Sequence, residues 1–184
     1  MLMQNRAPGL NRGFAAEQFP QLGSELWREE RDAARAAIHP TDFRARGTDI
    51  DPDCVRVAKE SAVRAGVAAI CDFSVMDARN ISNPDGVRGT IVTNPPYGER
   101  LMTMDEANRL YAAIGRAFTA LAPWQVYILS SDADFERHYG KRADKVRKLY
   151  NGMIPCNLYQ FFKADKPAAD RRPPRAPYPK REWR

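Results

Sequence analysis

The sequence predicts an α/β fold, in which helices cover both faces of a mostly parallel sheet and a C-terminal antiparallel hairpin follows. Three observations predict it. Short apolar runs alternate along the chain with longer segments of helical periodicity. Polar residues follow three of these runs, where a parallel sheet places its ligands. The 184 residues, 43% hydrophobic and 28% charged, are the length and composition of one ordinary domain.

In the first half of the chain, proline and glycine set the boundaries of the elements. Ser24 is a candidate helix cap, Pro52 suits the first turn of a helix, and Gly66 suits the end of that helix. The predicted elements are a loop over 1–23, a helix over 24–38, a strand over 43–48, a helix over 52–65 and a strand over 70–75.

In the second half, apolar residues recur at helical spacing in one long segment, and short apolar runs lie on either side of it. The turn region at Asn151 and Gly152 indicates an antiparallel hairpin. The predicted elements are a strand over 90–93, a helix over 105–121, a strand over 126–129, a short helix over 132–139 and strands over 145–150 and 158–162. We expect residues 1–163 to form the domain, and residues 164–184 to be a basic, proline-rich and disordered tail.

The net charge of +6 is unevenly distributed. Residues 1–136 carry 15 basic and 19 acidic side chains, whereas residues 137–148 and 163–184 are each net +5. An acidic body with a basic C-terminal third is typical of a protein that binds a polyanion on one side. A solvated basic tail is the alternative.

Several classes of protein are excluded. The longest apolar runs fall short of the roughly 20 residues of a spanning helix, and the first residues lack the pattern of a signal peptide. The cysteines (Cys54, Cys71 and Cys156) form no C-x-x-C pair, which argues against a disulfide framework or a zinc site. We expect a cytoplasmic protein without a metal, whose cysteines are small buried apolar residues.

The strongest local signal is Asn94-Pro95-Pro96-Tyr97, directly after the predicted strand over 90–93. Two prolines prevent a helix from starting there and keep the preceding residue extended. The Asn94 amide oxygen and a backbone carbonyl are then two acceptors that suit a planar amine, and Tyr97 offers a flat face to a base. A rigid turn without function is the alternative.

This motif resembles that of the class I S-adenosylmethionine-dependent amino-methyltransferases, whose fourth strand ends in Asn/Asp/Ser-Pro-Pro-Tyr/Phe/Trp. The longer run over 93–101 is similar to the bacterial 23S rRNA guanine-N(2)-methyltransferases that carry a THUMP domain, some of which are called adenine-specific DNA methylases. Residues 7–12, 48–52 and 148–152 also match, so the resemblance covers about residues 1–163.

The resemblance implies a Rossmann-like fold and transfer of a methyl group from S-adenosylmethionine to the exocyclic amine of a guanine in 23S rRNA. Asp49 would accept hydrogen bonds from the cofactor ribose, with Asp51 as a nearby substitute. Ile50 would pack on the adenine, and Asp77, beside Met76, would accept from the adenine amine. From the residues alone, Asp51 equally suits a helix cap, and Asp77 a turn.

The catalytic residues implied are those of the motif, namely Asn94, Pro95, Pro96 and Tyr97. Asn94 and the Pro95 carbonyl would hold the amine, and Tyr97 would stack on a base that has left its helix. This chemistry needs no cysteine or histidine nucleophile, and the sequence shows no partner for His39 or His138.

The RNA contacts are expected in two places. Glu99 and Arg100 either contact the target strand or pair with each other. Basic side chains further along the chain would contact RNA phosphates; they are Arg137, Lys141, Arg142, Lys145, Arg147 and Lys148.

One part of the family pattern is missing from this sequence. The family begins with a strand that ends in Asp-Pro-x-Cys-Gly-Ser-Gly, and this strand would lie between those ending at Asp49 and Asn94. We therefore expect a C-terminal fragment or a misassigned start, with weak or no binding of S-adenosylmethionine. An adenine-specific DNA methyltransferase and a non-catalytic RNA-binding remnant are the rival functions; the run over 98–101 favours rRNA guanine.

Overall fold

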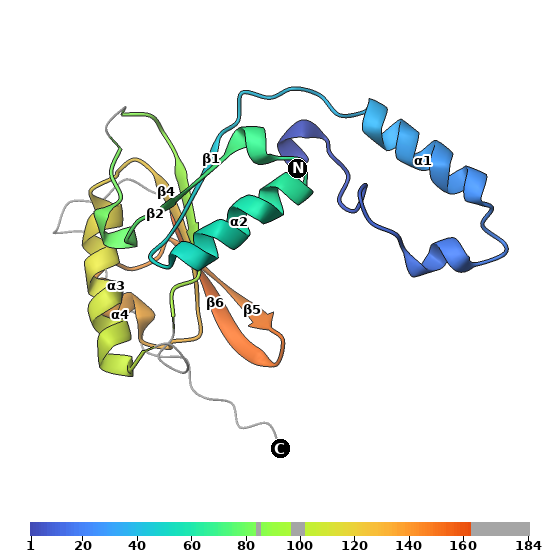
Figure 1. The fold of residues 1–184 in the computed structure, drawn as a ribbon. Coiled ribbons are helices and arrows are strands. Elements are labelled where there is room, and N and C mark those ends of the chain that lie inside the picture. The colour runs from blue at the N-terminus through green and yellow to red at the C-terminus, as the bar shows by residue number, and fades with distance from the viewer. Residues whose placement is uncertain (84–85, 97–101, 163–184) are drawn as a thin grey trace, which may run out of the picture. The chain divides into compact units, whose positions relative to one another are not determined.

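The computed structural model describes residues 1–83, 86–96 and 102–162 (Figure 1). The predicted tail, Tyr97, Glu99 and Arg100 lie outside them. The chain divides into two compact units, Met1–Asp77 and Ala78–Arg184. No helix among the described residues is long and apolar enough to cross a membrane.

The first unit is built on two parallel strands. The strands β1 (Ala45–Asp49) and β2 (Cys71–Val75) pair in register from Ala45 with Cys71 to Asp49 with Val75. Helix α2 (Pro52–Arg64) connects them and lies along this sheet (Figure 1). The unit also contains α1 (Ser24–Ala36) and short 3-10 helices at Leu2–Gln4, Ala15–Gln18 and Ala68–Ile70.

Gly47 explains how the two strands fit together. A Cβ atom at this position would lie 2.6 Å from the ring of Phe73, the residue that faces it on β2. The ring therefore crosses β1 where there is no side chain.

The predicted elements of this unit are present with shifted ends. Helix α1 begins at Ser24, but Gly23 occupies the cap position, so the prediction that Ser24 is the cap is wrong. Strand β1 begins and ends later than the predicted 43–48. The cysteine prediction also holds only in part, because Cys156 is buried whereas Cys54 is exposed.

The second unit contains a mixed sheet of order β3-β4-β6-β5. Strands β3 (Thr90–Thr93) and β4 (Gln125–Ser130) are parallel, and β6 (Ile154–Phe161) is antiparallel to both β4 and β5 (Lys145–Asn151). The predicted hairpin is confirmed. Among the described strands of this sheet, β3, β4 and β5 run in one direction, and β6, between β4 and β5, runs in the other. The predicted sheet, mostly parallel with a C-terminal antiparallel hairpin, is therefore found.

Helices α3 (Met104–Thr119) and α4 (Phe135–Tyr139) pack against each other, and their apolar residues form the core with those of the sheet. Tyr111, Ile114 and Phe118 of α3 are buried in this core. Tyr111 meets the ring of Phe135 edge to face at 5.0 Å between centroids. Further rings continue the core; they are Tyr139, Tyr159 and Phe161.

Candidate functional site

The ends of β1 and β2 bring together the two segments to which the resemblance gives cofactor contacts. The Met76 amide donates to the Asp49 carbonyl over 2.9 Å. Residues 49–51 and 76–77 therefore lie next to each other at the carboxyl end of the parallel pair, which is where such sheets bind ligands.

Asp49 and Ile50 are suitable for a nucleoside. The Asp49 carboxylate is exposed, and its Oδ1 accepts the Asp51 amide over 3.0 Å, which orients the group. Ile50 is 70% exposed, which is unusual for a large apolar side chain. An exposed carboxylate can accept hydrogen bonds from hydroxyl groups, and an exposed apolar side chain can cover a flat ring.

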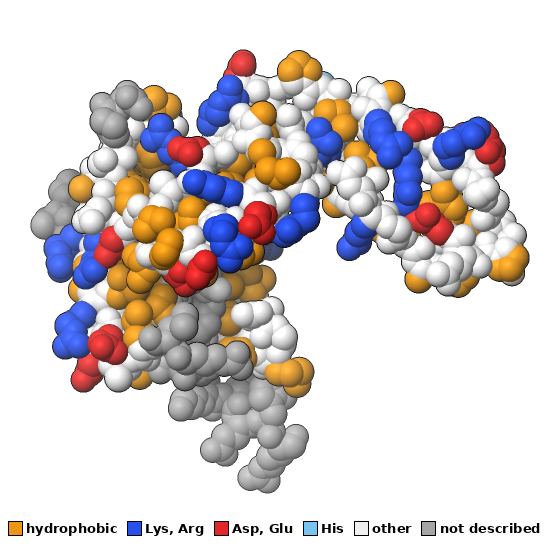
Figure 2. Space-filling view, viewed as in Figure 1, with side chains coloured by type: hydrophobic (Ala, Val, Ile, Leu, Met, Phe, Trp, Pro, Cys, Tyr) orange, Lys and Arg blue, Asp and Glu red, His pale blue; other side chains and the backbone are white. Residues whose placement is uncertain are grey.

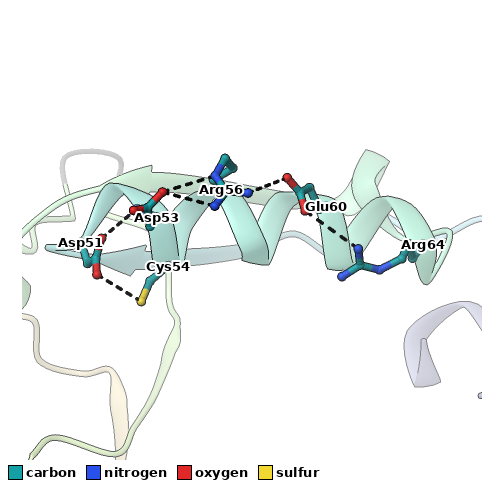
Figure 3. A network of polar contacts seen from close by, with 6 residues as sticks. All are labelled: Asp51, Asp53, Cys54, Arg56, Glu60 and Arg64. Atoms are coloured by element: carbon teal, nitrogen blue, oxygen red, sulfur yellow. Dashed lines mark hydrogen bonds and ion pairs between the residues drawn. The ribbon is translucent and has the colours of Figure 1, made fainter.

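Asp51 forms the helix cap that the sequence allowed. Its Oδ1 accepts the Asp53 amide over 2.8 Å at the start of α2, and its Oδ2 lies 3.7 Å from the Cys54 sulfur (Figure 3). Desolvation and the charges of Asp51 and Asp49 raise the pKa of this thiol. Cys54 is therefore protonated at neutral pH and is a poor nucleophile.

The remaining charges in Figure 3 form a chain of ion pairs along the helix. Arg56 contacts Asp53 and Glu60, and Glu60 also pairs with Arg64 at 3.9 Å. All of these side chains are about half exposed or more, so this is a solvated helix face that contributes little stability.

The proline motif directly follows β3 and is anchored by α3. Pro95 is buried and Asn94 is exposed. The carbonyl oxygen of Pro96 accepts a hydrogen bond of 2.8 Å from the hydroxyl of Tyr111, whose side chain is fully buried. The core of the second unit thus holds the backbone of the motif at a fixed place.

Tyr111 is the residue that the sequence analysis missed. It lies three residues before Ile114, on the stripe of the predicted helix, so its burial could be expected from the spacing. The hydrogen bond from Tyr111 to Pro96, 15 residues earlier, cannot be predicted from the spacing of apolar residues.

A polar cluster at the end of β4 corrects the prediction that His138 has no partner. His138 Nδ1 lies 3.3 Å from an oxygen of Asp132, whose side chain is only 8% exposed. The Asp132 amide donates to the hydroxyl of Ser130 over 3.1 Å, and its carbonyl accepts from Tyr159 over 3.1 Å. Burial raises the pKa of Tyr159 to about 12, so this phenol remains a donor at neutral pH.

The basic residues assigned to RNA divide into two groups. Arg137 pairs with Asp134 at 3.5 Å, and Lys141 and Arg142 have interactions of their own. The others lie exposed on β5; they are Lys145, Arg147 and Lys148. On the face that Figure 2 displays, Lys and Arg side chains are also mixed with acidic ones over helices α1 and α2.

Comparisons with known proteins show the family of the chain. The family model of the RMKL-like methyltransferase domain, UPF0020, matches residues 1–160. YpsC of Bacillus subtilis (strain 168), which carries the name of an RNA methyltransferase, is 37% identical over 168 residues, or 91% of this chain and 43% of YpsC. The ribosomal RNA large subunit methyltransferase K/L of Psychromonas ingrahamii (strain DSM 17664 / CCUG 51855 / 37) is 34% identical over 181 residues, or 94% of this chain and 24% of the relative.

A solved structure gives the same result. SMU.472, described as a methyltransferase and crystallised with SAH, superposes with a TM-score of 0.81 at 34% identity, covering 89% of this chain and 44% of its own. The chain thus spans less than half the length of each of these relatives. The family match over nearly all the described residues shows that the chain belongs to the RMKL-like methyltransferase domain family.

Proposed function

We propose that this chain is the catalytic part of a methyltransferase that transfers the methyl group of S-adenosylmethionine to the exocyclic amine of a guanine in 23S rRNA. The observation that carries the proposal is the motif Asn94-Pro95-Pro96, fixed after β3 by the bond from Tyr111 to Pro96. Relatives named ribosomal RNA large subunit methyltransferase K/L support the choice of RNA.

The chemistry follows from two acceptors. The lone pair of an exocyclic amine is delocalised into the purine ring, so the amine is a weak nucleophile. Hydrogen bonds from its two N–H groups to the Asn94 side chain and the Pro95 carbonyl hold it in place and favour the tetrahedral geometry of attack. S-adenosylmethionine supplies a methyl group that is already activated, so positioning by the protein provides much of the rate enhancement. Tyr97 would stack on the base.

The cofactor would be held at the ends of β1 and β2. Asp49 accepts from the ribose, Ile50 covers the adenine, and Asp77, beside Met76, accepts from the adenine amine. Asp51 already caps α2, so it is the weaker candidate for the ribose. The adjacent ends of β1 and β2 and the SAH complex of SMU.472 support this assignment.

The RNA would lie along the basic residues of β5 and the charged residues after the motif. Lys145, Arg147 and Lys148 are exposed on one strand and suit phosphate contacts, which position the substrate without reading its sequence. Glu99 and Arg100 would act close to the target base.

Asn94→Ala, made in the whole methyltransferase of which this chain is the catalytic part, tests the proposal. Loss of one preorganised hydrogen-bonding group is expected to lower the rate of methyl transfer about 10²- to 10³-fold, while cofactor affinity is unchanged. Transfer of a tritiated methyl group to 23S rRNA gives the rate, and calorimetry gives the affinity. Asn94→Asp keeps an acceptor oxygen and should retain more activity, and the exposed Asn80→Ala is the matched control with the activity of the parent.

The competing functions give different results in the same assay. Methyl groups found on adenine in duplex DNA would identify a DNA methyltransferase. RNA that binds without being labelled would identify a non-catalytic RNA-binding protein. Full activity of Asn94→Ala would refute the role of the motif.

A further inference from the structure

The free end of the hairpin carries exposed apolar residues that the proposed chemistry does not use. Strand β4 pairs with β6 only from Asn157 onward, whereas β5 pairs with β6 from Ile154. The end of the hairpin therefore extends beyond β4. Figure 1 shows this end pointing away from α3 and α4. Two apolar side chains at this end are unusually exposed to solvent: Tyr150 is 61% exposed and Met153 is 94% exposed.

Positive charge accompanies these apolar side chains. Residues 145–161 contain Lys145, Arg147 and Lys148 and no aspartate or glutamate. Lys148 and Tyr150 lie two residues apart on the same face of β5, and the Lys148 Nζ lies 5.5 Å from the centre of the Tyr150 ring. An exposed ring with a cation beside it is the combination that proteins use to bind single-stranded nucleic acids.

Protection of an edge strand accounts for only part of this pattern. Lysine and arginine on β5, the last strand of its sheet, discourage pairing with a second copy of the chain. That purpose does not require an exposed tyrosine and methionine at the end of the hairpin, which would instead favour association. Charge complementarity therefore favours a polyanion as the occupant, and the aromatic ring favours one whose bases are unpaired.

We propose that the end of the hairpin binds a single-stranded segment of RNA, with a base stacked on Tyr150, an apolar contact from Met153, and a phosphate on Lys148. The choice of RNA rests on the proposed function. The inference adds that the protein binds unpaired nucleotides besides the target base, which would help to keep that base out of its helix.

Fluorescence anisotropy of the whole chain, without cofactor, tests this inference. The probes are a labelled 12-nucleotide RNA that cannot fold on itself and the same strand annealed to its complement. We expect tighter binding of the single strand, and a loss of at least about fivefold with Tyr150→Ala. Tyr150→Phe should bind as the parent does, because it keeps the ring. Lys148→Ala should reduce the slope of log K against log salt by about 0.7.

Phe19→Ala is the matched control, since Phe19 is also an exposed aromatic residue but lies outside the hairpin; its affinity should equal that of the parent. Equal affinity for duplex and single strand, no RNA binding at 50 mM salt, or full affinity of Tyr150→Ala would overturn the inference. The assay involves no methyl transfer. If Tyr150→Ala loses RNA binding but the parent protein methylates no RNA, the proposed function is contradicted and this inference still stands.

Discussion

Tyr111 shows how a single hydroxyl positions a motif that cannot anchor itself. Pro95 and Pro96 have no backbone N–H, so the segment after Asn94 offers acceptors and no donors of its own. A fixed position therefore requires a donor from elsewhere. The Tyr111 hydroxyl, buried within the core, provides it over 2.8 Å.

Tyr111→Phe should separate positioning from packing. The ring keeps its edge-to-face contact with Phe135, so the loss in stability should be about 0.5–1.5 kcal/mol, the net contribution of one hydrogen bond. We expect a clear decrease in kcat for methyl transfer with an unchanged KM for S-adenosylmethionine. Tyr139→Phe alters another buried tyrosine of the cluster and should leave kcat as in the parent. Equal kcat values for both variants and the parent would contradict the positioning role.

At this scale, the sequence predicts residue types better than partners. Asn94 and its prolines could be found because composition and position after a strand mark them. The bonds from Tyr111 to Pro96 and from His138 to Asp132 join residues 15 and six positions apart, and only the folded chain brings them together. Asp51 is an intermediate case, since caps are local and the sequence already allowed one.

Among the elements, the packing of α3 on α4 depends on the absence of one side chain. A Cβ atom at Gly115 would lie 2.1 Å from the carbonyl oxygen of Tyr139, the last residue of α4. A backbone carbonyl cannot move aside as the end of a flexible side chain can. The two helices can therefore approach this closely only because residue 115 is glycine.

Gly115→Ala should therefore destabilise the protein, although alanine is the better helix former by about 1 kcal/mol. Displacement of α4 is expected to cost about 1–3 kcal/mol, measured as a lower urea midpoint of unfolding. Gly13→Ala is the control, because its nearest neighbour would be 3.9 Å away and its effect should stay within about 0.5 kcal/mol. A higher midpoint for Gly115→Ala would show that the helices do not meet there.

The sequence predicts element types well and element ends less well. Among the described residues of the second unit, the sequence predicts every helix and strand of four or more residues, because apolar periodicity is strong there. The sequence does not predict that β6 begins at Ile154, because a proline such as Pro155 argues against a strand. Pro155 is accommodated because β4 pairs with β6 only from Asn157, so among the described strands none lies on that side of this residue.

For the whole molecule, the two units differ in how much apolar surface they bury. Among the described residues, four buried apolar residues lie in the first unit, namely Leu10, Val55, Ala62 and Ile70, and the other 13 lie in the second. Helix α1 buries none. Composition does not reveal this asymmetry, because valines such as Val57, Val63 and Val75 in the first unit remain exposed.

The asymmetry predicts two unfolding transitions, because burial of apolar surface is the main stabilising contribution. Trp27 stacks on Phe14 in the first unit, and Trp124 donates to the Val87 carbonyl over 2.7 Å in the second, so each reports on its own unit. With Trp183 and one of these two replaced by phenylalanine, the fluorescence of Trp27 should change at a lower urea concentration than that of Trp124. Circular dichroism of both variants should match the parent before urea is added. Coincident transitions would show that the chain unfolds as one cooperative unit, with the first unit stabilised by more than its own core.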